Sequence, residues 1–134
     1  MADTFQLEIV TPDKLVVDDR AEEMQIPGKN GYLGVLPGHA PLITELAVGE
    51  ISYRRGTTTE RLAVAWGFAE VLPEKVTILA QTAERAEEID KARAERARER
   101  AQAHLKSGDP GTDFARAQTA LERAEVRLEV AGKG

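Results

Sequence analysis

The chain contains no cysteine and few of the other side chains on which catalytic and metal sites depend. Without cysteine it cannot form disulfides, bind metals through thiolates or use a thiol nucleophile. It has two serines, Ser52 and Ser107, and two histidines, His39 and His104. These lie too far apart in the sequence to favour a Ser-His triad or a zinc site. We therefore predict no catalytic residue, no metal site and no required cofactor.

Long apolar runs and an excess of basic charge are also missing. No stretch approaches the roughly 18 uninterrupted apolar residues of a membrane span. The first residues, Met-Ala-Asp-Thr-Phe, lack the basic and apolar regions of a signal peptide. The formal net charge of −5 argues against a general nucleic-acid binder. We expect a soluble cytosolic protein that binds no nucleic acid and that can still work beside a membrane.

The composition changes near residue 82. Seven of the 11 glycines and five of the six prolines lie in residues 1–82, whereas residues 74–107 and 112–131 contain neither. Acidic residues outnumber basic ones by 12 to 7 in residues 1–82, but the two are equal at 11 each in residues 83–134. Two structural units, 1–82 and 83–134, are the simplest explanation.

The first unit has the pattern of an antiparallel β-sandwich. Phe5, Leu7 and Ile9 alternate with more polar neighbours, as in a half-buried strand. Further short apolar runs follow at close spacing, divided by glycine and proline turns, and no helical stretch separates them. Because only 4% of the residues are aromatic, the core must be mainly aliphatic.

The second unit has the pattern of two antiparallel helices. We predict that Thr82 caps the first helix and that Gly108 ends it in a left-handed conformation. Thr112 or Asp113 then caps the second helix, and a short loop makes the helices neighbours. Apolar residues follow a helical spacing in both: Ala94, Ala97, Ala101 and Leu105, then Phe114, Ala117, Leu121, Ala124, Leu128 and Ala131.

This helical hairpin should close tightly but be held weakly. A buried methyl contributes only about 0.8 kcal/mol, against roughly 1.5–3 kcal/mol for a leucine side chain. Its stripes are mostly alanine, so little buried apolar surface holds the two helices together. An element that is held weakly is suited to being a switch.

Arginines gather on both predicted helices, with Arg93, Arg96 and Arg100 on the first and Arg116, Arg123 and Arg127 on the second. The simpler interpretation is a solvated face with glutamate partners at i,i+4, each pair worth tenths of a kcal/mol. The functional alternative is a site for an anion or an acidic partner, because arginine forks match phosphate and carboxylate.

The segment Ile26–Leu42 is rich in rigid turns and includes Gly-Tyr-Leu-Gly-Val-Leu-Pro-Gly-His-Ala-Pro-Leu at residues 31–42. Composition alone favours a hairpin with an irregular loop over a docking surface. However, this segment, together with Ile78-Leu79-Ala80 and the run Ala83–Ala94, resembles the epsilon subunit of F-type ATP synthase. The resemblance extends from Phe5 to Ala131.

The resemblance implies a non-catalytic subunit in the rotor's central stalk, on the cytoplasmic face of the bacterial plasma membrane. The sandwich would pack on the gamma subunit and the c-subunit ring, and so couple ring rotation to ATP synthesis and proton transport. The hairpin would extend toward the catalytic alpha and beta subunits and restrain ATP hydrolysis. Expected docking residues are Lys29, Asn30, Tyr32 and His39 toward the ring, and Arg96 and Arg100 toward an acidic segment of the catalytic subunits.

Some bacterial members of the family also bind ATP in the folded hairpin, through an Ile-Asp-x-x-Arg-Ala motif. The motif stands here as Ile89-Asp90-Lys91-Ala92-Arg93-Ala94. The resemblance implies that Arg93, Arg123 and Arg127 meet the phosphates and that Glu84 and Asp90 hold the base or ribose. Alternatively, these arginines only face acidic residues of partner subunits.

Two other classes of protein stay open on the sequence. A small β-sandwich that binds a soluble ligand would need a convergent polar pocket, and residues 1–82 show no candidate. A coiled-coil scaffold would explain the helices, but each is short and its stripe is alanine rather than leucine.

Overall fold

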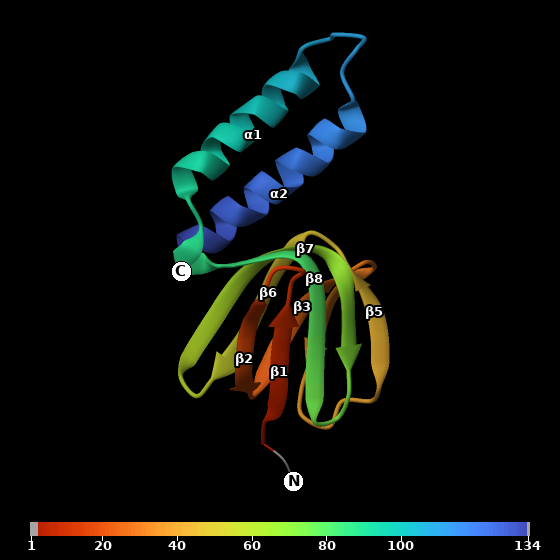
Figure 1. The fold of residues 1–134 in the computed structure, drawn as a ribbon, viewed down its shortest axis with the longest axis vertical. Helices are drawn as coiled ribbons and strands as arrows, with labels where there is room; N and C mark the ends of the chain where they lie inside the picture. Colours follow the sequence, from red (N-terminus) through yellow and green to blue (C-terminus); the bar gives the residue numbers. More distant parts are fainter. Residues whose placement is uncertain (1–2, 134) are drawn as a thin grey trace.

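A computed structural model describes residues 3–133 of the chain. Eight strands are followed by a short 3-10 helix and two α-helices (Figure 1). The strands are β1 (Phe5–Val10), β2 (Leu15–Ala21), β3 (Glu23–Gly28), β4 (Gly31–Val35), β5 (Leu42–Leu46), β6 (Gly49–Arg55), β7 (Thr58–Val71) and β8 (Lys75–Arg85). The helices are η1 (Ala86–Glu88), α1 (Lys91–Lys106) and α2 (Phe114–Lys133). The predicted sandwich and helical hairpin are confirmed.

The strands form a continuous hydrogen-bonded path that wraps into a sandwich, in the order β2-β1-β8-β7-β5-β3-β4, with β6 paired to β3 and β7. Neighbouring strands are antiparallel except β1 and β8, which are parallel. The whole of the intervening chain joins β1 to β8, and parallel neighbours require such a long connection. The sandwich is therefore antiparallel in all but this one pairing.

The core of the sandwich is aliphatic, as the composition predicts. Phe5, Leu7 and Ile9 on β1 are at most 1% exposed, and they alternate with half-buried neighbours. Tyr53 is one of the few aromatic residues in this core, and its hydroxyl donates a hydrogen bond to Asp19 Oδ2 (2.6 Å). Burial raises the pKa of Tyr53 to about 12, so this hydroxyl stays protonated at neutral pH.

Strand β8 is longer than the sequence suggests, and the prediction that Thr82 caps a helix is wrong. Thr82 lies within β8 and pairs with Ala65 of β7, and the pairing continues to Arg85 opposite Leu62. The helix begins only at Lys91, where the Asp90 carboxylate accepts a hydrogen bond from the Arg93 N–H (3.1 Å). Pairing with β7 overrides the local capping signal, so strand structure continues beyond the expected boundary at residue 82.

The other ends of the helices agree with the sequence. Gly108 has a φ of 66°, the left-handed conformation that ends a helix. Asp113 caps α2, because its Oδ1 accepts a hydrogen bond from the Arg116 N–H (3.0 Å). The alanine stripe joins the two helices, and its buried members are Ala94, Ala101, Ala117, Ala124 and Ala131. Phe114, which also belongs to the predicted stripe, is instead 48% exposed.

The hairpin is docked on one end of the sandwich through α2, which lies nearer to the strands than α1 does (Figure 1). A small hydrophobic cluster joins them, and it is separate from the sandwich core: Ala63, Ala86, Ile89, Val130 and Ala131. We call it the docking cluster. None of the helices that the structure describes combines the length and the hydropathy needed to cross a membrane.

Candidate functional site

A cleft of about 820 Å³ runs between α1 and α2 and reaches the C-terminal end of β8. Its floor is made by the alanine stripe, including Ala97, Ala101 and Ala124. Small side chains let the helices approach each other and leave room above them for the longer residues of both helices. The cleft therefore exists because the stripe is alanine rather than leucine.

Basic side chains dominate the walls of this cleft. Five arginines line it: Arg93 and Arg100 from α1, and Arg116, Arg123 and Arg127 from α2. His104 is a sixth basic group, and the acidic residues present are Glu84, Asp109 and Asp113. The walls thus carry more positive than negative charge, which favours an anionic ligand.

Most of this positive charge is not neutralised by the protein. Four of the cleft arginines form no ion pair within the described part of the chain: Arg93, Arg100, Arg116 and Arg123. On each helix two of the four are seven residues apart, about 10 Å along the axis. Both helices thus present arginines along the cleft, and the packing of α1 on α2 brings these arginines together.

Arg127 is the exception, since it is held by Glu84 of β8. Its Nε lies 2.8 Å from Glu84 Oε1, and its Nη2 donates a hydrogen bond to Oε2 (3.2 Å). This pair links α2 to the sandwich at the inner end of the cleft. Glu84 therefore serves the docking of the hairpin as well as lining the cleft.

Of the six residues predicted to bind ATP, the structure brings four together in the cleft: Glu84, Arg93, Arg123 and Arg127. Ile89 and Asp90 do not line it. Ile89 is 8% exposed and belongs to the docking cluster, and the Asp90 carboxylate is used to cap α1. Docking of the hairpin explains Ile89, and the start of α1 explains Asp90. Neither residue contacts the cleft directly.

The predicted docking residues of α1 are also divided by the structure. Arg100 lines the cleft together with Arg93, whereas Arg96 is exposed and does not line it. Arg96 lies one turn from both on the same side of α1, but it is not among the α1 residues that line the cleft, which are 93, 97, 100, 101 and 104.

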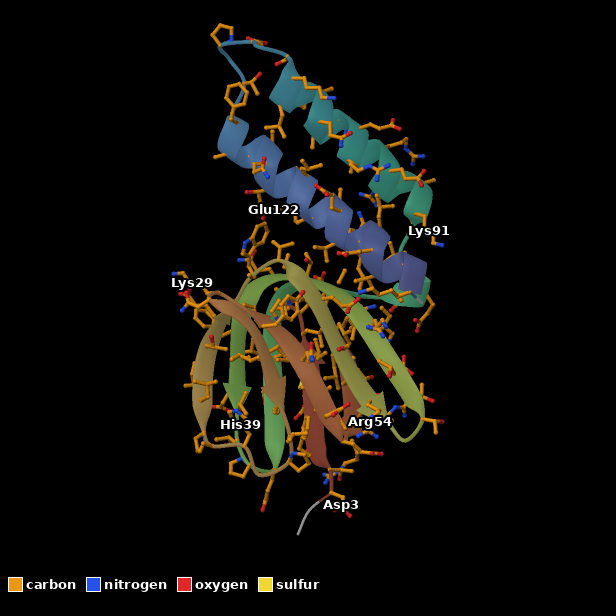
Figure 2. The ribbon with its side chains drawn as sticks, turned by 180° about the vertical axis from the view of Figure 1, so that it is seen from behind. Asp3, Lys29, His39, Arg54, Lys91 and Glu122 are labelled. Atoms are coloured by element: carbon orange, nitrogen blue, oxygen red, sulfur yellow. The ribbon has the colours of Figure 1, made fainter. Side chains whose placement is uncertain are left out.

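Lys29 and His39, which the resemblance implies both face the c ring, lie at opposite ends of the sandwich (Figure 2), so no single loop region contains both. Strand β4 runs between them and separates the two turns. Lys29 and the exposed Asn30 are at the end nearer the hairpin, where Lys29 Nζ lies 3.1 Å from Glu45 Oε2. His39 is half-buried beside the β7–β8 turn, next to the Gly38 N–H that donates to the Pro73 carbonyl (2.8 Å).

Tyr32 is near the start of β4, at the same end of the sandwich as Lys29. Its ring is 57% exposed, and its hydroxyl accepts a hydrogen bond from the Glu50 N–H (2.9 Å). The Glu50 carboxylate in turn lies 3.1 Å from Arg61 and 3.3 Å from Lys133 Nζ at the end of α2. Tyr32 is thus connected through Glu50 to the C-terminal end of the hairpin.

The sequence did not single out an exposed apolar face on β5, β7 and β8. Phe68 and Leu79 are direct partners across the β7–β8 pair and are 52% and 54% exposed. Ile43, on the outer side of neighbouring β5, is 70% exposed. We call these three residues the apolar face. Ile43 and Phe68 can be assigned to this face only from the strand register, which decides the side of the sheet on which each side chain lies.

Trp66 is a further residue that sequence reasoning missed. Its ring lies beneath Arg123, with 5.4 Å between the guanidinium carbon and the ring centroid. It is the only tryptophan of the chain, and it is far from Arg123 in sequence. Within residues 3–133, no three histidine, aspartate or glutamate side chains come together as a possible metal site.

Comparison with known protein families gives matches to both units. Residues 4–86 match the family described as "ATP synthase, Delta/Epsilon chain, beta-sandwich domain". Residues 87–132 match "ATP synthase, Delta/Epsilon chain, long alpha-helix domain".

Several curated proteins are similar over most of the chain. An ATP synthase epsilon chain from Koribacter versatilis is 71% identical over 110 residues, which cover 82% of this chain and 78% of that protein. The ATP synthase epsilon chain of Syntrophobacter fumaroxidans is 50% identical over 133 residues, covering 99% of each.

Among solved structures, one similar chain belongs to the Euglena gracilis mitochondrial ATP synthase, in a structure of OSCP, F1 and c-ring. It has a TM-score of 0.84 and 28% sequence identity, and the match covers 98% of this chain and 82% of that one. A chain from the Tetrahymena thermophila mitochondrial ATP synthase, central stalk and c-ring, shares the fold with a TM-score of 0.58 and 11% identity, covering 96% of this chain and 94% of that one. This chain belongs to the ATP synthase delta/epsilon chain family, whose members are non-catalytic subunits of that complex.

Proposed function

We propose that the protein is a rotor subunit in the central stalk of a proton-translocating F-type ATP synthase. In this role the sandwich binds the gamma subunit and the c-subunit ring, and it transmits ring rotation to ATP synthesis in the alpha and beta subunits. The subunit reaches the cytoplasmic face of the bacterial plasma membrane only through the complex. The likeness to a chain of the Euglena assembly that contains F1 and c-ring supports this position.

The apolar face is the observation that supports docking on gamma. Exposed apolar side chains that adjoin one another on a sheet mark an interaction surface more often than scattered ones do. Ile43, Phe68 and Leu79 are such a set, and the hairpin does not cover them. The gamma subunit is the partner that this face would pack against in the stalk.

A charge placed in this face should prevent assembly. In Phe68→Glu, a carboxylate would have to be buried against gamma, so the variant should fold but fail to co-purify with gamma. Leu36→Glu is the matched control, because Leu36 is also 59% exposed but follows β4, which pairs with β3 and not with the strands of the apolar face. Equal assembly of both variants would contradict the assignment of this face.

The hairpin is the regulatory part of the proposal. It is attached to the sandwich by the small docking cluster and by a few ion pairs, whereas the sandwich has a large core of its own. We expect the hairpin to leave the sandwich and extend toward the catalytic subunits, where it restrains ATP hydrolysis. Arg96, which is already exposed, would then be carried to an acidic segment of those subunits.

Removal of the hairpin tests this role in the assembled complex. A chain cut after residue 88 keeps all of β8 and should support ATP synthesis with faster hydrolysis than the full chain. A cut after residue 82 would remove the last β8 residues, which pair with Leu62–Val64, and so damage the sandwich itself. Loss of coupling in the chain cut after residue 88, with its sandwich intact, would show that the roles of the two units are wrongly assigned.

ATP sensing by the closed hairpin completes the proposal. ATP carries several negative charges, and the unneutralised arginines on both helices converge only in the closed form. ATP would bind this form and not the extended one, and so shift the population toward closure by its differential affinity. A ligand at roughly 100 times its dissociation constant stabilises the binding form by about 2.7 kcal/mol. This is enough to hold a weakly docked hairpin.

Calorimetry on the isolated subunit tests ATP sensing. Hydrogen bonds to charged groups contribute about 1.5–3 kcal/mol, so Arg93→Ala should weaken saturable ATP binding at least about tenfold. Arg96→Ala is the matched control, because Arg96 is on the same helix but does not line the cleft. No binding at millimolar ATP would leave the subunit with the mechanical role alone.

A further inference from the structure

Trp66 is held in an unusual backbone conformation at the bend of β7. Its φ is 52°, and within residues 3–133 it is the one non-glycine residue with positive φ. Gly67 follows with a φ of 128°, and a Cβ there would lie 1.9 Å from the Leu79 carbonyl oxygen. The backbones of β7 and β8 are therefore in close contact at this point. Conformations of this kind persist only where the surroundings determine them, and they gather at ligand sites.

The bend presents the ring of Trp66 to the hairpin. Trp66 pairs with neither neighbouring strand at its own position, whereas Ala65 and Gly67 on either side pair with β8. The ring is half-buried, and it lies beneath the guanidinium group of Arg123. A small cavity of about 30 Å³ between α2 and the strands is lined by Ala65 and Arg123. Arg123 therefore lies where α2 meets the edge of the sandwich, and it also lines the cleft.

An aromatic ring holds an arginine differently from a carboxylate. A carboxylate accepts hydrogen bonds from the guanidinium and neutralises its charge, as Glu84 does for Arg127. An aromatic face attracts the cation through its quadrupole and leaves the N–H donors free. Arg123 thus has a fixed place but keeps its full charge and its donors for another partner.

We propose that Trp66 is a positioning residue for the nucleotide phosphates in the cleft: it holds Arg123 over the edge of the sandwich with its donors directed to the anion. This inference rests on the proposed ATP binding and assigns to the same site a residue outside the helices. It explains why a large aromatic residue occupies a left-handed position where glycine would be free of strain.

The experiment measures ATP binding by calorimetry in the full chain and in Trp66→Phe and Trp66→Leu. Both replacements keep a Cβ and hence the backbone strain, but only phenylalanine keeps an aromatic face. A cation–π contact at an exposed site corresponds to about a two- to fivefold change in affinity. We expect Trp66→Leu to weaken ATP binding by this factor and Trp66→Phe to recover most of it. In the Arg123→Ala background, Trp66→Leu should have no further effect.

Trp66 also gives a direct spectroscopic readout. Because it is the only tryptophan, its emission in the unmodified chain should change saturably with ATP, with the same dissociation constant as calorimetry gives. Lys133→Ala is the control for hairpin docking, since Lys133 contacts Glu50 and does not line the cleft. If Trp66 acts only through docking, Lys133→Ala will weaken ATP binding as much as Trp66→Leu does.

The outcomes separate this inference from the function on which it rests. No ATP binding by the unmodified chain would overturn both. ATP binding with equal affinities for Trp66→Leu and Trp66→Phe would overturn the inference alone, as would an undiminished effect of Trp66→Leu in the Arg123→Ala background. A loss that phenylalanine recovers and that disappears without Arg123 would support it.

Discussion

Replacing Val130 by alanine should release the hairpin from the sandwich without unfolding the sandwich. Val130 is fully buried at 0% exposure, and it belongs to the docking cluster rather than to the sandwich core. The change removes two methyl groups, worth about 0.8 kcal/mol each, and leaves a cavity that adds to the loss. Alanine returns at most about 0.7 kcal/mol through its higher helix propensity. The net cost to docking is about 1–2 kcal/mol, or a factor of roughly 5–30 in the ratio of docked to undocked hairpin.

Two signals follow this release. Trp66 emission should report undocking of α2 at a lower temperature than in the unmodified chain, because Arg123 then leaves the ring. The circular dichroism signal of the strands should keep the same transition temperature as in the unmodified chain. In the assembled ATP synthase, more extended hairpin should mean slower ATP hydrolysis. Glu129→Ala, at the exposed neighbouring position, is the matched control.

A single result would refute this reasoning. If Val130→Ala lowers the transition of the strands as much as it lowers that of the hairpin, the two units unfold as one. The docking cluster would then be part of a common core, and a hairpin held by such a core could not act as an independent switch.

Three further predictions concern neighbouring features. Lys133→Ala should also favour undocking, by no more than about 1 kcal/mol because its ion pair with Glu50 is partly exposed, and Trp66 emission will measure it. Gly67→Ala should destabilise the sandwich severely in thermal unfolding, because its Cβ has no room beside β8; a change within about 0.5 kcal/mol would contradict the close contact. The Gly56 N–H holds the pKa of Glu22 below its usual 4.5, so this carboxylate stabilises the fold at neutral pH. That contribution should disappear as the pH falls through the folded-state pKa, and Glu22→Gln should show less loss of stability in acid than the unmodified chain.

The pattern of local residues was enough to predict the two kinds of structure. Alternation of Phe5, Leu7 and Ile9 indicates a strand whatever the fold of the rest of the chain, because the side-chain period of a strand is two. The left-handed Gly108 and the cap at Asp113 likewise depend on residues within one turn. These elements are as predicted because the forces that form them act between near neighbours.

Local pattern failed at Thr82 because a distant segment decides its structure. Thr82 followed by several glutamates has the composition of a helix start, but it pairs with Ala65 in a strand. Lys29 and His39 are close in sequence but lie at opposite ends of the sandwich (Figure 2), because strand β4 runs from one end to the other between them.

The candidate site was predictable in its charges but not in its assembly. The sequence alone determined that a sandwich is followed by an arginine-rich hairpin with an alanine stripe, since helical period, glycine turns and small side chains are local properties. Only the tertiary structure decided that Arg100 joins Arg93 in the cleft, that Asp90 is used as a cap, and that Trp66 lies beneath Arg123. Such contacts depend on how α2 docks on β7, and packing between segments that are far apart in the chain fixes that arrangement.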